Sequence, residues 1–425
     1  YNTGAMVNDI PRFTLDDDND GQMELGANSG GATYIHLTIY HKHTLCNLDS
    51  ASHDISVAGH SGECGGEIDF KEWTDYAAQQ DYGSATFASG GGYVRATNWL
   101  PRTGNWYLSK DVTLKEGWEA NNEDVTLNLC FNGHTVTSDK SNTSSSLLRV
   151  CSGASANLTD CAATPGGLRG NSALTAQRGL QVSWGYVNLY NGTITGFTST
   201  YGAGVSVEPR SSGSFGLYGN AAIQYNKSTN TGDLKFGGYY PNSELEKVSD
   251  RDTAGGGGVA NYGKFTMNSL RSDAIAYNSA ARYGGGLFNW PYGDTYRWAK
   301  LLNGGITGNT AGEQGGGVLT SHNPDDTALT LGGNVSITGN TLTDDTDDNL
   351  YLVTDTKNGS VAKICVSGLT EDADIQVVEV EGREGKDYFN GVTYETLPPE
   401  VLARITTNNG SIFAWNEAHD TILLV

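Results

Sequence analysis

The chain has 425 residues, with 48 acidic and 26 basic side chains, which gives a formal net charge of −22 at pH 7. A surface this acidic repels nucleic acid and anionic membranes, so we expect neither as a partner. The sequence has no run of 18 apolar residues that could span a bilayer. The 57 glycines lack the strict spacing of collagen, and 22 tyrosines and 8 tryptophans argue against a disordered chain.

Residues 1–105 are expected to form an N-terminal domain that also caps the segment after it. Asp16, Asp18 and Asp20 stand at alternate positions of an acidic loop, the spacing at which oxygen ligands suit calcium. The twelfth position of this loop is Ala27, where an EF-hand carries a bidentate glutamate. Calcium binding by the three aspartates is therefore one hypothesis, and a solvated acidic turn is the alternative. No other cofactor is expected.

Two histidines and two cysteines follow in the same domain. His43, Cys46, His60 and Cys64 have side chains that zinc accepts, but their spacing departs from that of a zinc ribbon. A disulfide between Cys46 and Cys64 would close a short loop and suits an extracellular chain at least as well. Both interpretations stay open.

The stretch from Gly179 to Asn340 repeats one phrase five times. Each repeat opens with a glycine-rich step into an aliphatic residue, continues with alternating apolar residues, and closes on an isoleucine and a turn. The aliphatic openers are Val182, Val205, Val259, Leu287 and Val318, and the closing residues are Ile194, Ile223, Ile275, Ile306 and Ile337. Three short strands per repeat, with Gly and Asn at the corners, predict a parallel β-helix.

The spacing between repeats supports this interpretation. The step from a closing isoleucine to the next opener is 11, 36, 12 and 12 residues, so one corner carries an insertion of 24 residues (36 minus 12), at about residues 227–255. Insertions grow only where they leave stacked strands intact. Alternate strand residues point inward, so stacked coils share one core. Corner asparagines tolerate a left-handed conformation and can form a ladder of like residues.

The segment before the repeats carries further motifs. They are F-x-x-W at Phe70–Trp73, W-Y-L-x-x-D-V-T-L at Trp106–Leu114 and L-x-L-C-x-N-G-H-x-V at Leu127–Val136. Followed by G-G-G-V repeats, this order resembles the glycine-rich β-helix surface proteins of gut bacteria. The G-G-G-V and G-N-T phrases are also similar to repeats of chlamydial polymorphic outer-membrane proteins. The resemblance covers roughly residues 66–350 and implies a right-handed parallel β-helix in an extracellular or cell-surface bacterial protein.

The predicted fold class is therefore all-β. A right-handed parallel β-helix over residues 106–350 follows the N-terminal β-containing domain, and residues 351–425, whose alternating strands depart from the repeat, form a small C-terminal β cap. Cys130 and Cys151 lie in apolar strands and are expected to pack as small core residues.

Aromatic residues at variable corners are the candidate ligand-binding groups. They are Trp290, Tyr292, Tyr296 and Trp298 in one corner, and Tyr239 and Tyr240 in the insertion. Exposed aromatic rings bind sugars by covering their C–H faces, and aromatic loops also form protein interfaces. Alternatively, these rings pack onto the solenoid as a small local core. The pectinase-type, nucleophile-elbow, phosphate-loop and dinucleotide motifs are absent from the sequence, so no catalytic residue is predicted.

Three functions remain open. The favoured one is a non-enzymatic, adhesin-type surface protein that binds glycans or host surface proteins through its aromatic loops. The second is a self-associating subunit of an extracellular fibre, joined through strands such as 33–41 or 421–425. The third is a carbohydrate-active enzyme, a polysaccharide lyase or glycoside hydrolase, which would use carboxylates of the insertion such as Glu244, Glu246 or Asp250.

Overall fold

A computed structural model describes residues 103–208, 213–232, 255–291, 296–354, 362–378 and 387–425, together with the backbone of five short strands before residue 73. The chain divides into two compact units, residues 1–70 and 71–425. In the first unit, β1 (Asn2–Val7) pairs antiparallel with β2 (Ile10–Thr14), and β3 (Asp54–Ile55) pairs antiparallel with β4 (Ile68–Asp69). The division lies before the boundary predicted at residue 105, because β5 (Lys71–Glu72) already pairs in parallel with β6 (Gly104–Tyr107).

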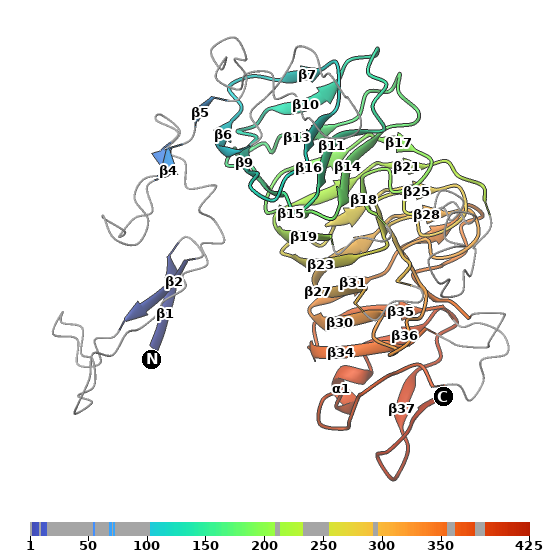
Figure 1. The fold of residues 1–425 in the computed structure, drawn as a ribbon. Coiled ribbons are helices and arrows are strands. Elements are labelled where there is room, and N and C mark those ends of the chain that lie inside the picture. The colour runs from blue at the N-terminus through green and yellow to red at the C-terminus, as the bar shows by residue number, and fades with distance from the viewer. Residues whose placement is uncertain are drawn as a thin grey trace. The chain divides into compact units, whose positions relative to one another are not determined.

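The second unit is a parallel β-helix with three faces, which confirms the predicted fold class (Figure 1). The first face holds β8 (Trp118–Ala120), β11 (Ser146–Cys151), β14 (Arg178–Ser183), β18 (Val205–Val207), β22 (Val259–Asn261), β26 (Leu287–Asn289), β29 (Val318–Thr320) and β33 (Leu350–Leu352). Each of these strands pairs in parallel with its neighbours one coil away.

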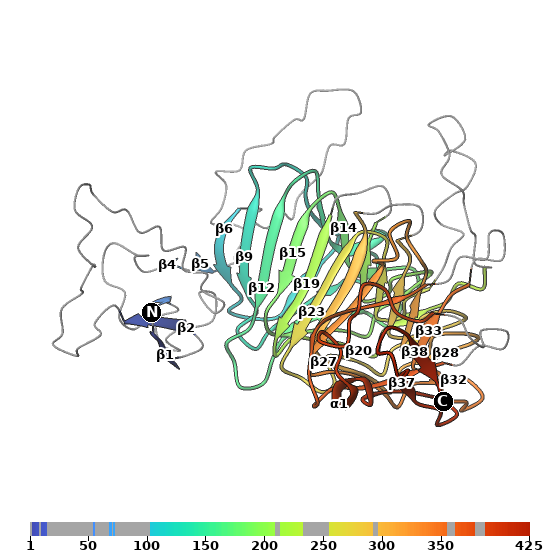
Figure 2. The same cartoon turned by 90° about the horizontal axis from the view of Figure 1, so that it is seen from below.

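The strands of the second face lie side by side in Figure 2. After β5 and β6 it holds β9 (Thr126–Cys130), β12 (Ser155–Thr159), β15 (Tyr186–Leu189), β19 (Ser214–Gly219), β23 (Lys264–Ser269), the first half of β27 (Trp298–Thr307), β30 (Leu329–Gly333) and β34 (Ile364–Leu369). All of these strands pair in parallel as well.

The third face completes each coil. It holds β7 (Val112–Leu114), β10 (Thr135–Ser138), β13 (Gly167–Arg169), β16 (Thr193–Thr195), β20 (Ala222–Gln224), β24 (Ile275–Ala276), the second half of β27, β31 (Val335–Ile337), β35 (Asp374–Val377) and β36 (Ile405–Thr407). A narrow fourth ladder follows it, made of β17 (Thr198–Ser199), β21 (Lys227–Ser228), β25 (Ser279–Ala280), β28 (Thr310–Ala311) and β32 (Thr341–Leu342).

One apolar core runs through the coils. On the third face the predicted isoleucines lie in register, as Ile223 pairs with Ile275 and Ile275 with Ile306, and all are fully buried. On the second face Phe215 stacks on Phe265, with ring centroids 5.7 Å apart. Each fully buried side chain of this size contributes roughly 1.5–3 kcal/mol, so stacking of coils is what stabilises the individual strands.

A buried asparagine ladder follows the third face. It consists of Asn226, Asn278, Asn309, Asn340 and Asn349. In each step, the side-chain Nδ2 and the backbone N–H both donate to the Oδ1 of the next asparagine, as from Asn278 to Asn309 at 2.9 Å. The ladder confirms the predicted bonding between corner asparagines. Before Asn226, Asn278, Asn309 and Asn340, however, the left-handed residue is the one that precedes the asparagine, for example Gly308 with φ +65°.

Parallel pairing continues past residue 350, where the sequence placed the start of the C-terminal cap. Leu329 pairs with Ile364, and Ile337 pairs with Ile375, so inward apolar residues keep their register after the glycine phrase is lost. The end of the chain is formed by α1 (Pro399–Leu402) and the antiparallel pair β37 (Phe413–Trp415) and β38 (Ile422–Leu424). In the described part of the chain, no helix is long and apolar enough to cross a membrane.

Cys130 and Cys151 are buried, which confirms their predicted place in the interior. The structure adds that Cys130 Sγ lies 3.5 Å from Cys161 Sγ on the next coil. This hydrogen bond from Cys130 lowers the pKa of the Cys161 thiol, which favours the nucleophilic thiolate.

Oxidised glutathione is expected to join Cys130 to Cys161. The Cys161 thiolate attacks the glutathione disulfide, Cys130 then displaces the bound glutathione, and two reduced glutathione molecules leave as one protein disulfide forms. Closing a loop of this length should stabilise the protein by roughly 3–4 kcal/mol. Peptide mass mapping should find a cross-linked pair two hydrogens lighter, absent from Cys161→Ser. Retention of both thiols after oxidation would contradict the prediction.

Candidate functional site

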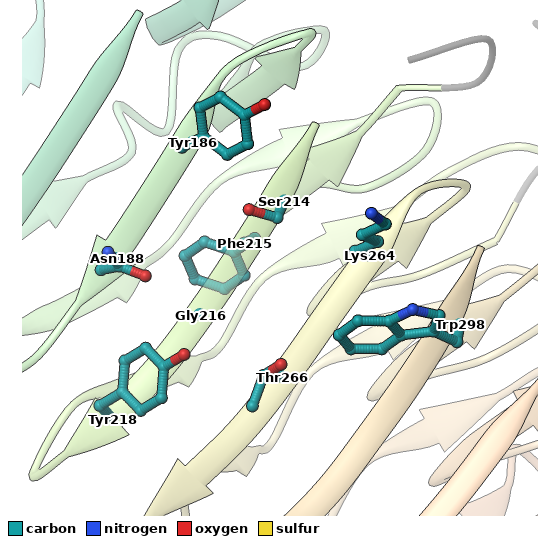
Figure 3. Close-up of a pocket in the computed structure, with 9 residues that line it drawn as sticks. All are labelled: Tyr186, Asn188, Ser214, Phe215, Gly216, Tyr218, Lys264, Thr266 and Trp298. Atoms are coloured by element: carbon teal, nitrogen blue, oxygen red, sulfur yellow. The ribbon is translucent and has the colours of Figure 1, made fainter. Parts of the chain in front are cut away.

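An open groove of about 280 Å³ lies on the outer surface of the second face, across β15, β19, β23 and β27 (Figure 3). It is lined by Tyr186, Asn188, Ser214, Phe215, Gly216, Tyr218, Lys264, Thr266 and Trp298. Gly216 stands in register between Asn188 and Thr266. Because a glycine has no side chain, the row of outward-facing groups leaves a gap at this point, which the Tyr218 ring partly covers as it lines the groove.

Aromatic residues stand on both sides of this gap. Tyr186, Ser214, Lys264 and Trp298 occupy one register row across four coils, and Figure 3 shows Tyr186 and Trp298 at its two ends. Their side chains face outward because the next residue of each strand, such as Phe215 after Ser214, points into the core. The Tyr186 side chain is 47% exposed. The row therefore presents rings to solvent on a rigid sheet.

Tyr218 forms the other side of the groove. A Cβ at Gly216 would meet the Tyr218 ring and would lie 2.7 Å from Asn188 Oδ1, so the ring position requires glycine there. The opposite neighbour of this ring is Tyr190, with centroids 5.5 Å apart and an interplanar angle of 23°. Burial raises the pKa of the Tyr218 hydroxyl, which therefore stays neutral near pH 7 and can both donate and accept hydrogen bonds.

The charge in the groove is positive, in contrast to the protein as a whole. Among the described residues, Lys264 is the charged residue of its lining and no carboxylate lines it. Lys300 lies beside the groove, with its Nζ 4.6 Å from the ring centroid of Trp298. This cation–π contact holds the indole against its neighbour. Acid catalysis of glycoside cleavage uses a pair of carboxyl groups, and the described lining of the groove holds none.

Two carboxyl groups with raised pKa values lie elsewhere in the solenoid. Burial raises the pKa of Asp160, whose oxygens accept backbone N–H groups of Gly133 and Gly166 at 2.9 Å. Burial also raises the pKa of Asp348 to about 6, and its Oδ1 accepts the Gly315 N–H at 2.9 Å. Perturbed carboxyl groups often mark active sites. Here both carboxyl groups accept hydrogen bonds from the backbone of the corners between strands, so their role is to stabilise those corners.

The structure separates the aromatic residues that the sequence grouped in one corner. Trp298 lines the groove. Trp290 is only 5% exposed and stacks on Phe288 with ring centroids 5.2 Å apart, so it packs onto the solenoid and lacks the exposed face that ligand binding was expected to use. Tyr296 is 78% exposed and does not line the groove. Tyr292, Tyr239 and Tyr240 lie outside the described residues.

The candidate metal and carboxylate sites of the sequence also lie outside the described residues. These are the calcium candidates Asp16, Asp18 and Asp20, the group His43, Cys46, His60 and Cys64, and the insertion residues Glu244, Glu246 and Asp250. Within the part of the chain that the structure describes, no group of three or more His, Cys, Asp or Glu side chains could hold a metal ion.

Sequence reasoning missed Tyr186, Tyr218 and Lys264. A signal for two of them exists, because Tyr186, Lys264 and Trp298 each come directly before the first inward residue of the middle strand of a repeat. Aligning the repeats on that inward residue places them in one outward row. The same alignment places Tyr218 in a second outward row with Tyr190, but the contact of its ring with Gly216 carries no sequence signal.

No protein-family model matches the chain, and no curated protein or solved structure matches it significantly. The resemblance to gut-bacterial surface proteins therefore stays a prediction from motifs, and the groove is the basis for a functional conclusion.

Proposed function

We propose that the protein is a non-catalytic, glycan-binding surface protein, and that the groove on the second face holds a sugar ring between Tyr186, Tyr218 and Trp298. The observation that carries this proposal is the arrangement of the lining, in which aromatic side chains stand at the edges of the groove and polar side chains lie between them on the sheet. Aromatic faces cover the C–H faces of a pyranose, while Asn188 and Thr266 offer hydrogen bonds to its hydroxyl groups. The volume of about 280 Å³ is near the lower end for small-molecule sites, which suits a ligand of this size.

The setting we propose is the outer surface of a bacterial cell. It is supported by the motif resemblance and by the acidic composition, which keeps an exposed solenoid soluble. The other two functions receive less support. The strand at residues 422–424, part of the segment predicted to join a fibre, already pairs with β37 on one edge. The carboxylates suggested for an enzyme lie outside the described residues.

Trp298→Ala is expected to weaken glycan binding about 10- to 100-fold, because a buried aromatic contact contributes roughly 1.5–3 kcal/mol and 1.4 kcal/mol corresponds to tenfold. The measurement is affinity electrophoresis of the full chain in gels that contain soluble xylan, mannan, β-glucan or polygalacturonate. A retarded wild-type band should regain its free mobility in the variant.

Tyr296→Ala is the matched control, because Tyr296 is an exposed aromatic residue two positions away that does not line the groove. Its retardation should equal that of the wild type. Equal losses in both variants, or an unchanged Trp298→Ala protein, would exclude the groove as the binding site. Free migration of the wild type in all four gels would exclude the function.

A further inference from the structure

Three exposed aromatic residues adopt a backbone conformation that suits glycine. Among the described residues, eight non-glycine residues have positive φ, and Trp184, Tyr225 and Tyr277 are the aromatic ones. Their exposed fractions are 55%, 60% and 47%. A left-handed conformation is a genuine outlier for a bulky side chain, and strain of this kind tends to be kept where it serves a function.

Tyr225 and Tyr277 occupy a corner that other coils give to glycine. The residue before Phe197, Asn226, Asn278, Asn309 and Asn340, at this corner of successive coils, is Gly196, Tyr225, Tyr277, Gly308 and Gly339, and all five have φ between +56° and +75°. Glycine adopts this conformation without the Cβ conflict that tyrosine has. The backbone conformation alone would therefore favour glycine at both positions. The presence of tyrosine at both indicates that these side chains do something other than stabilise the fold.

The two rings form a stack that is open at one end. Their centroids are 5.1 Å apart, with an interplanar angle of 16°. The Tyr277 ring lies over Gly308, where a Cβ would come within 2.8 Å of it. At Gly196 no ring of the described residues takes the corresponding place, since the described atoms nearest to a Cβ there are the backbone of Gly170, at 3.8 Å. The stack therefore ends at the exposed ring of Tyr225.

Polar side chains stand next to Tyr225 in the chain and just before the neighbouring strand of the Tyr277 coil. Gln224 Nε2 donates to the carboxylate of Asp273 at 3.0 Å, and Arg271 pairs with the same carboxylate through two bonds of 2.8 Å. Lys227, two residues after Tyr225, is exposed. An exposed ring with the polar residues Gln224 and Lys227 close to it in the chain offers the two kinds of group that contact a sugar.

We propose that Tyr225 and Tyr277 form a second carbohydrate-binding platform, the tyrosine shelf, on which a pyranose ring stacks against Tyr225 at the level of Gly196. A ring in that place continues the stack at the spacing of the coils, about 4.8 Å. Two rings are far too small for a stable protein interface, which buries about 1,200 Å² or more. The ligand class rests on the proposed function, whereas the residues are independent of the groove.

The test combines Tyr225→Gly and Tyr277→Gly in a background that carries Tyr186→Ala and Trp298→Ala. The full chain is mixed with millimolar methyl β-glucoside, β-galactoside, β-xyloside or α-mannoside, and saturation transfer from protein to the sugar C–H protons is recorded by NMR. The background protein should retain a signal for at least one glycoside. The two glycine substitutions should reduce that signal at least fivefold while the thermal midpoint stays equal or rises, because glycine suits both corners.

Tyr225→Phe with Tyr277→Phe is the conservative control and should retain the signal, since the stacked faces remain. A wild-type signal that vanishes in the background protein would overturn the shelf and leave the groove supported. A signal that survives the glycine substitutions would also overturn the shelf. A wild-type signal insensitive to Trp298→Ala but lost on substitution of the tyrosines would support the shelf and overturn the groove. Absence of any wild-type signal would overturn both.

Discussion

Asn309→Ala is expected to lower the free energy of unfolding by about 3–5 kcal/mol, because each buried polar group left without a partner costs roughly 1–3 kcal/mol. Asn309 is fully buried in the middle of the asparagine ladder. Its Nδ2 donates to Ile275 O at 2.8 Å and to Asn340 Oδ1 at 2.9 Å. Its Oδ1 accepts the backbone N–H and the Nδ2 of Asn278, both at 2.9 Å. Alanine removes these four bonds and a fifth, from Nδ2 to Thr307 O at 3.2 Å, and water does not reach the groups that remain.

Asn157→Ala is the matched control for this prediction. Asn157 belongs to a second asparagine ladder on the outer surface of the second face, where its Nδ2 donates to Asn128 at 2.9 Å and its Oδ1 accepts from Asn188 at 3.0 Å. Because solvent reaches this half-buried residue, water replaces the lost partners, and the expected cost is below about 1 kcal/mol. Urea unfolding followed by circular dichroism measures both variants. Similar losses would show that burial is not what makes the inner ladder important.

The core of the solenoid could be predicted because its physical cause is local. The pleat of a strand sends alternate residues inward, so the isoleucine that closes each repeat must meet the isoleucine of the next coil. Ile223, Ile275 and Ile306 do pair in this way. The asparagine that follows each of them was expected to bond to its counterpart for the same reason, and it does so.

The aromatic row of the groove emerges only when the repeats are aligned on their first inward residue, because its members come from coils of unequal length. Tyr186 and Trp298 stand in one row although 112 positions separate them (298 minus 186), and the register between them is fixed only once the insertions are known. The sequence placed Trp298 beside Trp290, its neighbour along the chain. In the structure the strand register places Trp298 in the row that begins at Tyr186, while Trp290 stacks on Phe288.

The burial of Trp290 follows from a second apolar cluster that strand alternation does not reveal. On the first face the residue after each inward side chain is also apolar in three successive coils, namely Ala260, Phe288 and Leu319. These outward residues pack with Tyr262 and Trp290. The signal is the pair of consecutive apolar residues at Leu287 and Phe288, which breaks the alternation. A prediction that relied on alternation counted only the inward member of each pair.

Gly285→Ala is expected to destabilise the solenoid by about 3–5 kcal/mol, at or above the upper range for overpacking. A Cβ at this position would meet the backbone carbonyl oxygens of Gly316 and Thr310, the second at 2.5 Å. These atoms belong to the next coil, and the Gly285 N–H donates to Gly315 O at 2.9 Å, so moving them apart breaks the ladder between coils. The cause is close backbone approach, because φ at Gly285 lies outside the left-handed region.

Gly368→Ala separates this effect from backbone strain. Gly368 has φ +63°, and no atom of the described residues lies within 4 Å of the position of a Cβ. Alanine there meets only the conformational cost, about 1–2 kcal/mol. Urea midpoints of the two variants should therefore differ clearly, with Gly285→Ala the less stable. Equal midpoints would mean that the glycines of each repeat are needed for their backbone conformation. A lower midpoint for Gly285→Ala would mean that they are needed because the stacked coils leave no room for a side chain.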